Sequence, residues 1–282
     1  LVRQDLSNSE TNFLADTTSI KREIHDSINS DQHPNVIFIL MESMSAEFMR
    51  EFGNDKSITP FMDGLAQKSL FFNNLYATGN RTVRGMEAVT LSLPPTPGSS
   101  VVKRPNNQNL FTISNVFHQK GYQCNFFYGG DGYFDNMNAF YGGNGFDIYD
   151  RGRGSILSDA IKTTRHNIND DEVTFENAWG ICDEDIYSKT IRVADEYYSK
   201  GKPFFNFVMT TSNHRPYTYP DKKIIIPSGT GRNGAVQYAD FALKQLFEQS
   251  KSKPWFKNTI FILVADHCAS SAGKDEIDVK NY

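Results

Sequence analysis

Residues 36–46 read VIFILMESMSA, an apolar run that ends in a single carboxylate, Glu42. No polar residue interrupts the run between Val36 and Leu40, which is typical of a strand buried on both faces of a parallel sheet. In open α/β sheets, ligands bind in the crevice beyond the carboxyl ends of the strands. Glu42 is therefore a candidate functional carboxylate at the end of a central strand.

Further apolar runs predict parallel neighbours for this strand. Strands are predicted over residues 36–42, 70–76, 124–128, 204–209 and 259–265. Helices are predicted over residues 83–91, 109–120, 183–200 and 235–249, and Thr59 before Pro60 predicts one more helix start. This alternation predicts an α/β fold with a doubly wound, mostly parallel sheet and helices on both faces, in three αβα layers.

The organisation of the rest of the chain follows from composition. Residues 1–33 are polar with a weak helical pattern, and we expect an N-terminal arm before a single domain that covers residues 34–282. The stretch 128–170 is rich in Gly, Asn and Asp and predicts loops that line a pocket.

Charge and cysteine content exclude several classes of protein. The formal net charge is -4 with a pI of about 5.9, so no basic field is present to bind nucleic acid. No apolar run approaches the roughly 18 residues of a membrane helix, and residues 1–10 lack the apolar core of a signal peptide. Three widely spaced cysteines fit neither a disulfide framework nor a zinc finger.

The run 259–265 repeats the pattern of the first strand, because it is apolar and is followed directly by Asp266 and His267. Carboxylate oxygens from Glu42 and Asp266 together with an imidazole nitrogen suit a divalent cation such as zinc or manganese. The alternative is a capped turn with a hydrogen-bonded histidine, which is a common structure after a strand.

A hydroxyl is expected near the same edge of the sheet. Residues 79–87 read GNRTVRGME and lead into the predicted helix 83–91, which places Thr82 at a helix N-terminus. Unpaired backbone N–H groups and the helix dipole favour a phosphoryl group there. A threonine hydroxyl bound to a divalent metal is also a competent nucleophile. The alternative is that Thr82 only caps the helix.

A histidine follows the predicted strand 204–209, within TTSNHRPY at residues 210–217. His214 is a candidate for binding substrate or for protonating a leaving group, although a single loop histidine often does neither. The coincidence carries more weight than any one motif, because several predicted strands deliver an acid, a hydroxyl or a histidine to one edge of the sheet.

In this order, PNVIFILMES, TPFMDGLAQKSLFFNNLYATGNRT, TTSNHRPY and FILVADH resemble the sulfatase-like branch of the alkaline phosphatase superfamily. The similarity runs from Pro34 to the end of the chain and is strongest to the lipoteichoic acid synthase and phosphoglycerol transferase group. It implies that Glu42, Asp266 and His267 hold one divalent metal ion (Mn²⁺, Zn²⁺ or Mg²⁺). Thr82 would be the nucleophile and fourth ligand, and His214 would contact substrate.

The resemblance implies a metal-dependent phosphotransferase. In this group a threonine attacks a phospholipid such as phosphatidylglycerol, diacylglycerol leaves, and the phosphothreonine passes its headgroup to a hydroxyl of an envelope glycan or polyol phosphate. Sulfatases need Cys or Ser in a Cys/Ser-x-Pro-x-Arg run, whereas residues 82–86 here read TVRGM, so sulfate ester hydrolysis is disfavoured. The alternatives are a phosphodiesterase of the same superfamily and a non-catalytic domain that binds a phosphorylated glycan.

The sequence departs from the Gram-positive synthases in the expected headgroup pocket. Their Phe-His-Gly and Trp-Asn-Arg stretches are replaced by FYG at 127–129 and DNM at 135–137. Methionine cannot pair with a phosphate, so Arg84, Lys103 or Arg104 would have to supply that charge. Asp131 is expected to bind substrate together with Arg84 and His214. Asp131 and Asp135 would instead suit a cationic headgroup such as ethanolamine.

Members of this group carry membrane helices before the catalytic domain and continue with further sheet and helix after the Asp-His pair. The resemblance therefore implies that residues 34–282 are a catalytic domain without its C-terminal part. It also implies a membrane-anchored protein whose catalytic domain lies outside the cytoplasm, in the periplasm or at the cell exterior.

Overall fold

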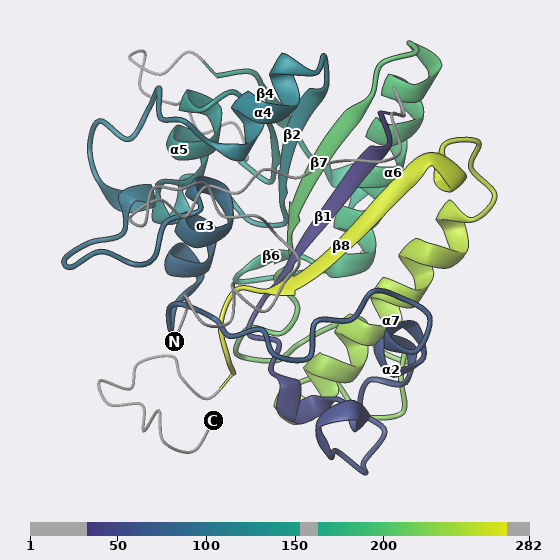
Figure 1. Ribbon diagram of the computed structural model, residues 1–282. Helices are drawn as coiled ribbons and strands as arrows, with labels where there is room; N and C mark the ends of the chain where they lie inside the picture. Colours follow the sequence, from purple (N-terminus) through teal and green to yellow (C-terminus); the bar gives the residue numbers. More distant parts are fainter. Residues whose placement is uncertain (1–32, 153–162, 270–282) are drawn as a thin grey trace, which may run out of the picture. The chain divides into compact units, whose positions relative to one another are not determined.

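The computed structural model describes residues 33–152 and 163–269 (Figure 1). The arm predicted over residues 1–33 lies outside them, apart from His33, and stays a prediction. The central sheet of the described chain has six parallel strands in the order β4-β3-β2-β7-β1-β8. Their bounds are β1 Asn35–Met41, β2 Gln123–Tyr128, β3 Asp147–Asp150, β4 Arg165–Asn167, β7 Phe204–Met209 and β8 Thr259–Ala265.

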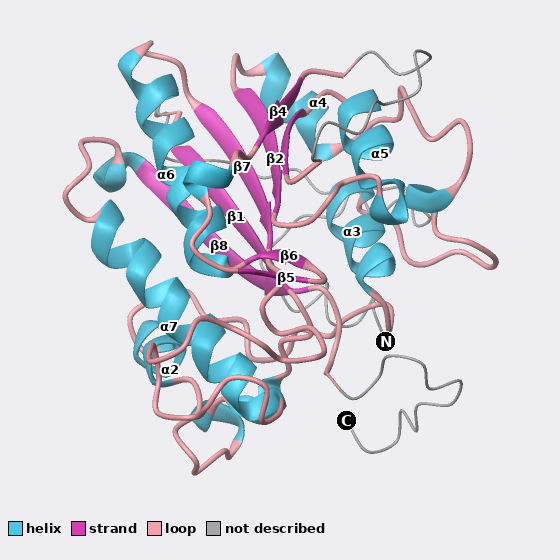
Figure 2. Ribbon diagram, turned by 180° about the vertical axis from the view of Figure 1, so that it is seen from behind, coloured by secondary structure: helices cyan, strands magenta, loops and turns pink. Residues whose placement is uncertain are grey.

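Helices cover both faces of this sheet (Figures 1 and 2). The α-helices are α2 Pro60–Ala66, α3 Thr82–Leu91, α4 Ile113–Gln119, α5 Met137–Gly143, α6 Asp183–Ser199 and α7 Arg232–Ser250. Single 3₁₀ turns are η1 Ala46–Phe48, η2 Arg50–Phe52, η3 Val101–Lys103, η4 Phe134–Asn136, η5 Asp170–Glu172 and η6 Phe256–Asn258. The predicted α/β fold with a parallel sheet between two helical layers is confirmed.

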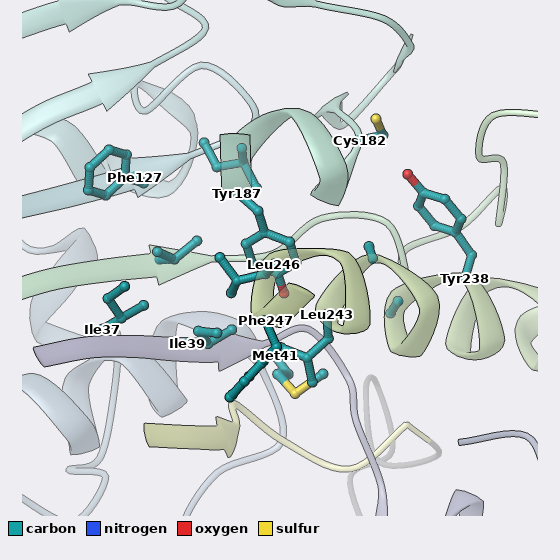
Figure 3. Packing of buried hydrophobic residues seen from close by; sticks show 14 of the residues in the cluster. Ile37, Ile39, Met41, Phe127, Cys182, Tyr187, Tyr238, Leu243, Leu246 and Phe247 are labelled. Atoms are coloured by element: carbon teal, nitrogen blue, oxygen red, sulfur yellow. The ribbon is translucent and has the colours of Figure 1, made fainter. Parts of the chain in front are cut away.

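Strand β1 is buried on both faces, as its unbroken apolar run predicts. Its side chains alternate between two hydrophobic clusters: Ile37, Ile39 and Met41 in one, and Val36, Phe38 and Leu40 in the other. The first cluster includes side chains of α6 and α7, and Figure 3 shows part of its packing around β1. The second includes side chains of α3, α4 and α5. Burial of this apolar surface stabilises the sheet by roughly 25 cal/mol per Å² removed from water.

The start of α2 shows why a cap is hard to predict from local sequence. Pro60 does occupy the first turn, but the hydroxyl of the predicted cap, Thr59, donates to the carbonyl of Phe48 instead. The carboxylate of Asp240 on α7 accepts the backbone N–H groups of Phe61 at 2.9 Å and Met62 at 2.8 Å. The helix is therefore capped by a residue far away in the chain.

The strand predicted over residues 70–76 is wrong, because this stretch is irregular and pairs with neither edge of the described sheet. Its large apolar side chains are mostly solvent-exposed, among them Leu70, Phe72, Leu75 and Tyr76. A sequence can contain an apolar run whether or not a neighbouring strand exists. A strand forms only when its backbone also makes hydrogen bonds to a neighbouring strand.

The stretch 128–170 holds more regular structure than predicted, since α5, β3 and β4 lie within it. Strands β3 and β4 span only four and three residues, too few for a readable apolar pattern. Helix α4 also begins later than predicted, after Thr112, whose backbone N–H donates to the side chain of Asn115 at 2.8 Å. A short antiparallel hairpin, β5 Glu176–Asn177 and β6 Gly180–Ile181, was not predicted.

The register of the sheet brings the predicted site residues to one edge. Met41 at the end of β1 pairs with Ala265 at the end of β8, so Glu42 and Asp266 leave the sheet side by side. On the other side of β1, Leu40 pairs with Met209, the last residue of β7. Among the described helices, none has the length and apolar character needed to cross a membrane.

Candidate active site

Glu42, Asp266 and His267 form a buried cluster at the carboxyl ends of β1 and β8. One ligand atom from each lies within 4.8 Å of the others. The Nε2 atom of His267 is 3.8 Å from Glu42 Oε1 and 3.4 Å from Asp266 Oδ2. All three residues are at most 5% exposed. The structure thus brings together the three residues that the sequence singled out as metal ligands.

The two carboxylate oxygens of Asp266 have different surroundings. Oδ1 accepts the backbone N–H groups of Ser43 and His267, each at 2.7 Å, and so caps the turn after β8. Oδ2 is buried and has no hydrogen-bond donor in bonding geometry among the described residues. Asp266 can therefore cap the turn and bind a metal ion at the same time, because each role uses a different oxygen of its carboxylate.

This cluster fits a divalent cation. Burial raises the pKa of Asp266 well above its ordinary value, and the neighbouring carboxylate of Glu42 raises the pKa further. Two buried carboxylates that repel each other are costly unless a positive charge lies between them. Oxygen and imidazole donors are the ligands that zinc and manganese accept.

The imidazole of His267 is oriented by its own turn. Its Nδ1 lies 2.9 Å from the carbonyl oxygen of Cys268, so we assign the proton to Nδ1. The lone pair of Nε2 then faces the two carboxylates. Ligand histidines in metal sites are commonly fixed in this way by a hydrogen bond from the other ring nitrogen.

Ser43 supports the cluster and was not singled out by the sequence. Its hydroxyl donates to Glu42 Oε1 at 2.7 Å, and its backbone N–H binds Asp266. Its φ of +48° places it in the left-handed region, which is uncommon for a residue other than glycine. Only the tertiary structure reveals that Ser43 contacts both carboxylates.

Replacing Ser43 with glycine should weaken binding of Mn²⁺ or Zn²⁺ about tenfold, in the range typical for the loss of a side chain that orients a ligand. The backbone N–H to Asp266 is kept, and glycine accepts the positive φ without strain. Isothermal titration calorimetry with each cation measures the effect. Ser57→Gly, at a φ of +49° away from the cluster, is the matched control and should leave affinity unchanged. Equal affinities in both variants would show that the Ser43 hydroxyl does not orient Glu42.

Thr82 is the first residue of α3, and its side chain points to the cluster. Its hydroxyl donates to Glu42 Oε2 at 3.1 Å. The N-cap position belongs to Arg81, so the alternative in which Thr82 only caps the helix is wrong. The first backbone N–H groups of a helix lack acceptors within the helix. The Thr82 hydroxyl therefore lies beside the candidate metal ligand Glu42 and at a helix N-terminus, which favours anions.

Gly85 allows α3 to approach this closely. A Cβ at this position would lie 2.7 Å from the Cα of Asp266 and closer still to its carbonyl oxygen. Any side chain would therefore push the first turn of α3 away from the end of β8. An isolated glycine within a helical pattern was the available signal for such a close approach.

The loop after β7 braces the end of β1. Thr210 accepts the backbone N–H of Glu42 at 3.0 Å, and the Asn213 side chain donates to the carbonyls of Glu42 and Ser43. The loop is in turn fixed to α6, because Asp183 accepts the backbone N–H groups of residues 211 and 212. Asp183 is fully buried, and this burial raises its pKa.

His214 follows directly on this braced loop. Its Nδ1 lies 3.3 Å from the carbonyl oxygen of Arg215, and its ring packs against the indole of Trp179 in the β5–β6 hairpin. Partial burial lowers the pKa of His214, and the charge of the Glu42 carboxylate offsets part of this lowering. Trp179 was not identified from the sequence.

Two predicted substrate-binding residues are held by other side chains. Arg84 forms a 2.9 Å ion pair with the buried Glu87 and also donates to the carbonyl of Gly98. Asp131 pairs with Arg165 at 2.9 Å. Contact of Arg84 or Asp131 with substrate stays a prediction.

Comparisons with known proteins show the family to which the chain is similar. The family model described as Sulfatase matches residues 34–280. The lipoteichoic acid synthase-like protein YvgJ of Bacillus subtilis is 25% identical over 264 residues, which cover 86% of this chain and 40% of that protein. Phosphoglycerol transferase I of Citrobacter koseri is 25% identical over 251 residues, covering 83% of this chain and 31% of that protein. The chain thus spans less than half the length of these relatives.

A solved structure extends the comparison to three dimensions. The crystal structure of an alkaline phosphatase superfamily protein from Vibrio parahaemolyticus aligns with a TM-score of 0.76 at 38% identity. The alignment covers 88% of this chain and 58% of that one. The predicted resemblance and fold class are confirmed by these matches.

Proposed function

The chain belongs to the sulfatase family, and from this premise we propose that it catalyses metal-dependent transfer of a phospholipid headgroup. The transferred group is phosphoglycerol or a close relative, and the acceptor is a hydroxyl of an envelope glycan or polymer. Relatives named as a phosphoglycerol transferase and a lipoteichoic acid synthase-like protein support this reaction class.

One observation carries the proposal: the hydroxyl of Thr82 lies 3.1 Å from a carboxylate oxygen of Glu42, beside Asp266 and His267. Glu42, Asp266, His267 and Thr82 would hold the cation. When bound, a divalent cation supplies a Lewis acid that lowers the pKa of the hydroxyl and offsets phosphate charge. A threonine is not converted to formylglycine, so the nucleophile itself argues against sulfate ester hydrolysis.

In the first transfer Thr82 Oγ1 releases its hydroxyl proton to water and forms a bond to the phosphorus of the donor phosphodiester. The bond from phosphorus to the diacylglycerol oxygen breaks, and this oxygen leaves with its electron pair and takes up a proton. His214 is the nearby group suited to donate that proton. The N-terminus of α3 favours the negative charge of the phosphoryl oxygens.

The second transfer regenerates the enzyme. A hydroxyl of the acceptor attacks phosphothreonine, its proton passes to His214, and the bond between phosphorus and Thr82 Oγ1 breaks. The headgroup is then joined to the acceptor, and Thr82 recovers its hydroxyl by taking a proton back from water. A single histidine can serve both steps because the proton it gives in the first is returned in the second.

The relatives favour a polyol headgroup, because one of them is named as a phosphoglycerol transferase. The acidic side chains expected to suit a cationic headgroup are engaged in ion pairs. Lys103 pairs with Asp135 at 2.6 Å, and Arg165 is shared between Asp131 at 2.9 Å and the buried Asp150 at 2.7 Å.

Transfer predicts a product that hydrolysis cannot give. With phosphatidylglycerol in detergent micelles, Mn²⁺ and a glucan acceptor, we expect diacylglycerol and phosphoglycerol-substituted glucan in equal amounts, measured by mass spectrometry. Reactions without glucan are the control and should stop after one turnover or proceed slowly with water. Free glycerol phosphate as the main product with glucan present would identify a phosphodiesterase. Purified protein that retains no divalent metal and forms no product would indicate a glycan-binding domain.

The location of the whole protein follows from its proposed substrates. A phospholipid donor and an envelope acceptor meet at the outer face of the cytoplasmic membrane or in the periplasm. We therefore propose that the described domain works outside the cytoplasm as part of a membrane-anchored protein.

A further inference from the structure

The β5–β6 hairpin is fastened across the carboxyl ends of the central strands (Figure 2). The backbone N–H of Ile181 donates to the carbonyl of Gly129 after β2 at 2.9 Å, and its carbonyl accepts the hydroxyl of Thr211 after β7 at 2.9 Å. Gly180 has a φ of +125°, and a Cβ there would overlap the backbone of Gly129. These contacts hold the hairpin in a fixed position at the carboxyl edge of the sheet.

The tip of this hairpin presents Trp179 to His214. The two ring centroids are 3.4 Å apart with an interplanar angle of 32°. The indole Nε1–H donates to the carbonyl of Arg215, which is also the acceptor next to His214 Nδ1. One carbonyl oxygen therefore fixes the in-plane orientation of both rings, while their stacking fixes the separation.

The imidazole has little else to hold it. Its bond to the Arg215 carbonyl, at 3.3 Å, is long, and it is the one hydrogen bond of the His214 ring among the described residues. A side chain held by one weak bond samples other rotamers at a cost of about 1 kcal/mol or less. The indole covers one face of the ring and removes that freedom.

We propose that Trp179 is a positioning residue, which holds the His214 imidazole with Nδ1 on the Arg215 carbonyl and leaves Nε2 for the substrate. The proposal rests on the proposed function for the proton transfers that His214 serves. With Nδ1 protonated, the neutral ring offers an Nε2 lone pair to an acceptor hydroxyl, and the protonated ring offers Nε2–H to the leaving oxygen.

The test replaces Trp179 with leucine and follows His214 in two ways. First, the ¹⁵N chemical shifts of the His214 ring report its tautomer without any substrate. The His214 signals are identified as those that disappear in His214→Ala. We expect one Nδ1–H tautomer in the wild type, and a mixture of tautomers with loss of the indole ring-current shift in Trp179→Leu. Trp179→Phe should keep the stacking but not the N–H donor and should lie between the two. Tyr133→Leu, an exposed aromatic on the neighbouring loop, is the control and should leave the tautomer unchanged.

The second readout is kinetic coupling. With phosphatidylglycerol as donor, Trp179→Leu should lower kcat/KM about tenfold, whereas the double variant Trp179→Leu/His214→Ala should be no slower than His214→Ala. Additive losses, or an unchanged tautomer in Trp179→Leu, would overturn the proposal. If the wild type transfers no headgroup at all, the proposed function fails, and the ¹⁵N spectra still decide whether Trp179 positions His214.

Discussion

Replacing Thr82 with alanine is expected to abolish headgroup transfer, lowering kcat/KM by at least about 10³-fold. The variant loses the one hydroxyl that lies both at the start of α3 and within 3.1 Å of Glu42. No covalent intermediate can then form. The three residues of the cluster stay in place, because alanine is well tolerated in the first turn of a helix.

Three measurements separate loss of the nucleophile from damage to the site. Intact-protein mass spectrometry after incubation with phosphatidylglycerol should show one added phosphoglycerol group on the wild type and none on Thr82→Ala. Calorimetric titration should show Mn²⁺ affinity within about tenfold of wild type, since only one of the four proposed ligands is lost. Thr82→Ser is the matched control, which keeps the hydroxyl and should retain both the adduct and measurable turnover. Turnover of Thr82→Ala near the wild-type rate would remove Thr82 from the mechanism.

A larger structural effect is expected from Gly85→Ala. The added methyl group would lie 2.7 Å from the Cα of Asp266, and the neighbouring atoms are backbone rather than a flexible side-chain end. Either α3 or the turn after β8 must move, at a cost of about 1–3 kcal/mol in the free energy of unfolding. Since Thr82 lies on α3 and Asp266 in the turn after β8, the two would separate, and metal affinity should fall about 10–100-fold.

The same substitution elsewhere gives the control for Gly85→Ala. Gly64 lies within α2, and a Cβ there would meet no atom within 4 Å. Gly64→Ala should therefore raise the free energy of unfolding by about 0.4–1 kcal/mol, through helix propensity and lower entropy of the unfolded chain. Chemical denaturation measures both variants. If Gly85→Ala were as stable as Gly64→Ala and bound Mn²⁺ like the wild type, the close approach of α3 to Asp266 would not matter for the site.

Sequence reasoning located the cluster because its residues follow strands with strong apolar patterns. Glu42 and the Asp266–His267 pair each come directly after such a run, and parallel strands deliver their carboxyl ends to one edge. The prediction failed for residues 70–76, where Asn73 and Asn74 interrupt the apolar residues and the stretch has no partner strand in the described sheet. Apolar residues alone therefore do not define a strand, which also needs a neighbouring strand for its backbone hydrogen bonds.

The residues that support the cluster and His214 could not be predicted from the sequence, for a different reason. The contacts of Ser43 with Asp266, of Asp183 with residues 211 and 212, and of Trp179 with His214 join positions that are 28 or more residues apart. Serine, aspartate and tryptophan are common residues, and nothing in their local sequence marks these particular ones. Such contacts depend on how the loops close over the sheet, which strand periodicity does not encode.

The pairing of Met41 with Ala265 has a mechanical consequence. The distance between the carboxylates of Glu42 and Asp266 is set by the ladder of hydrogen bonds between two adjacent strands, rather than by a loop that closes when the ion arrives. When a cation binds at such a preformed site, little of the chain has to become ordered. Most of the interaction energy is therefore available as affinity.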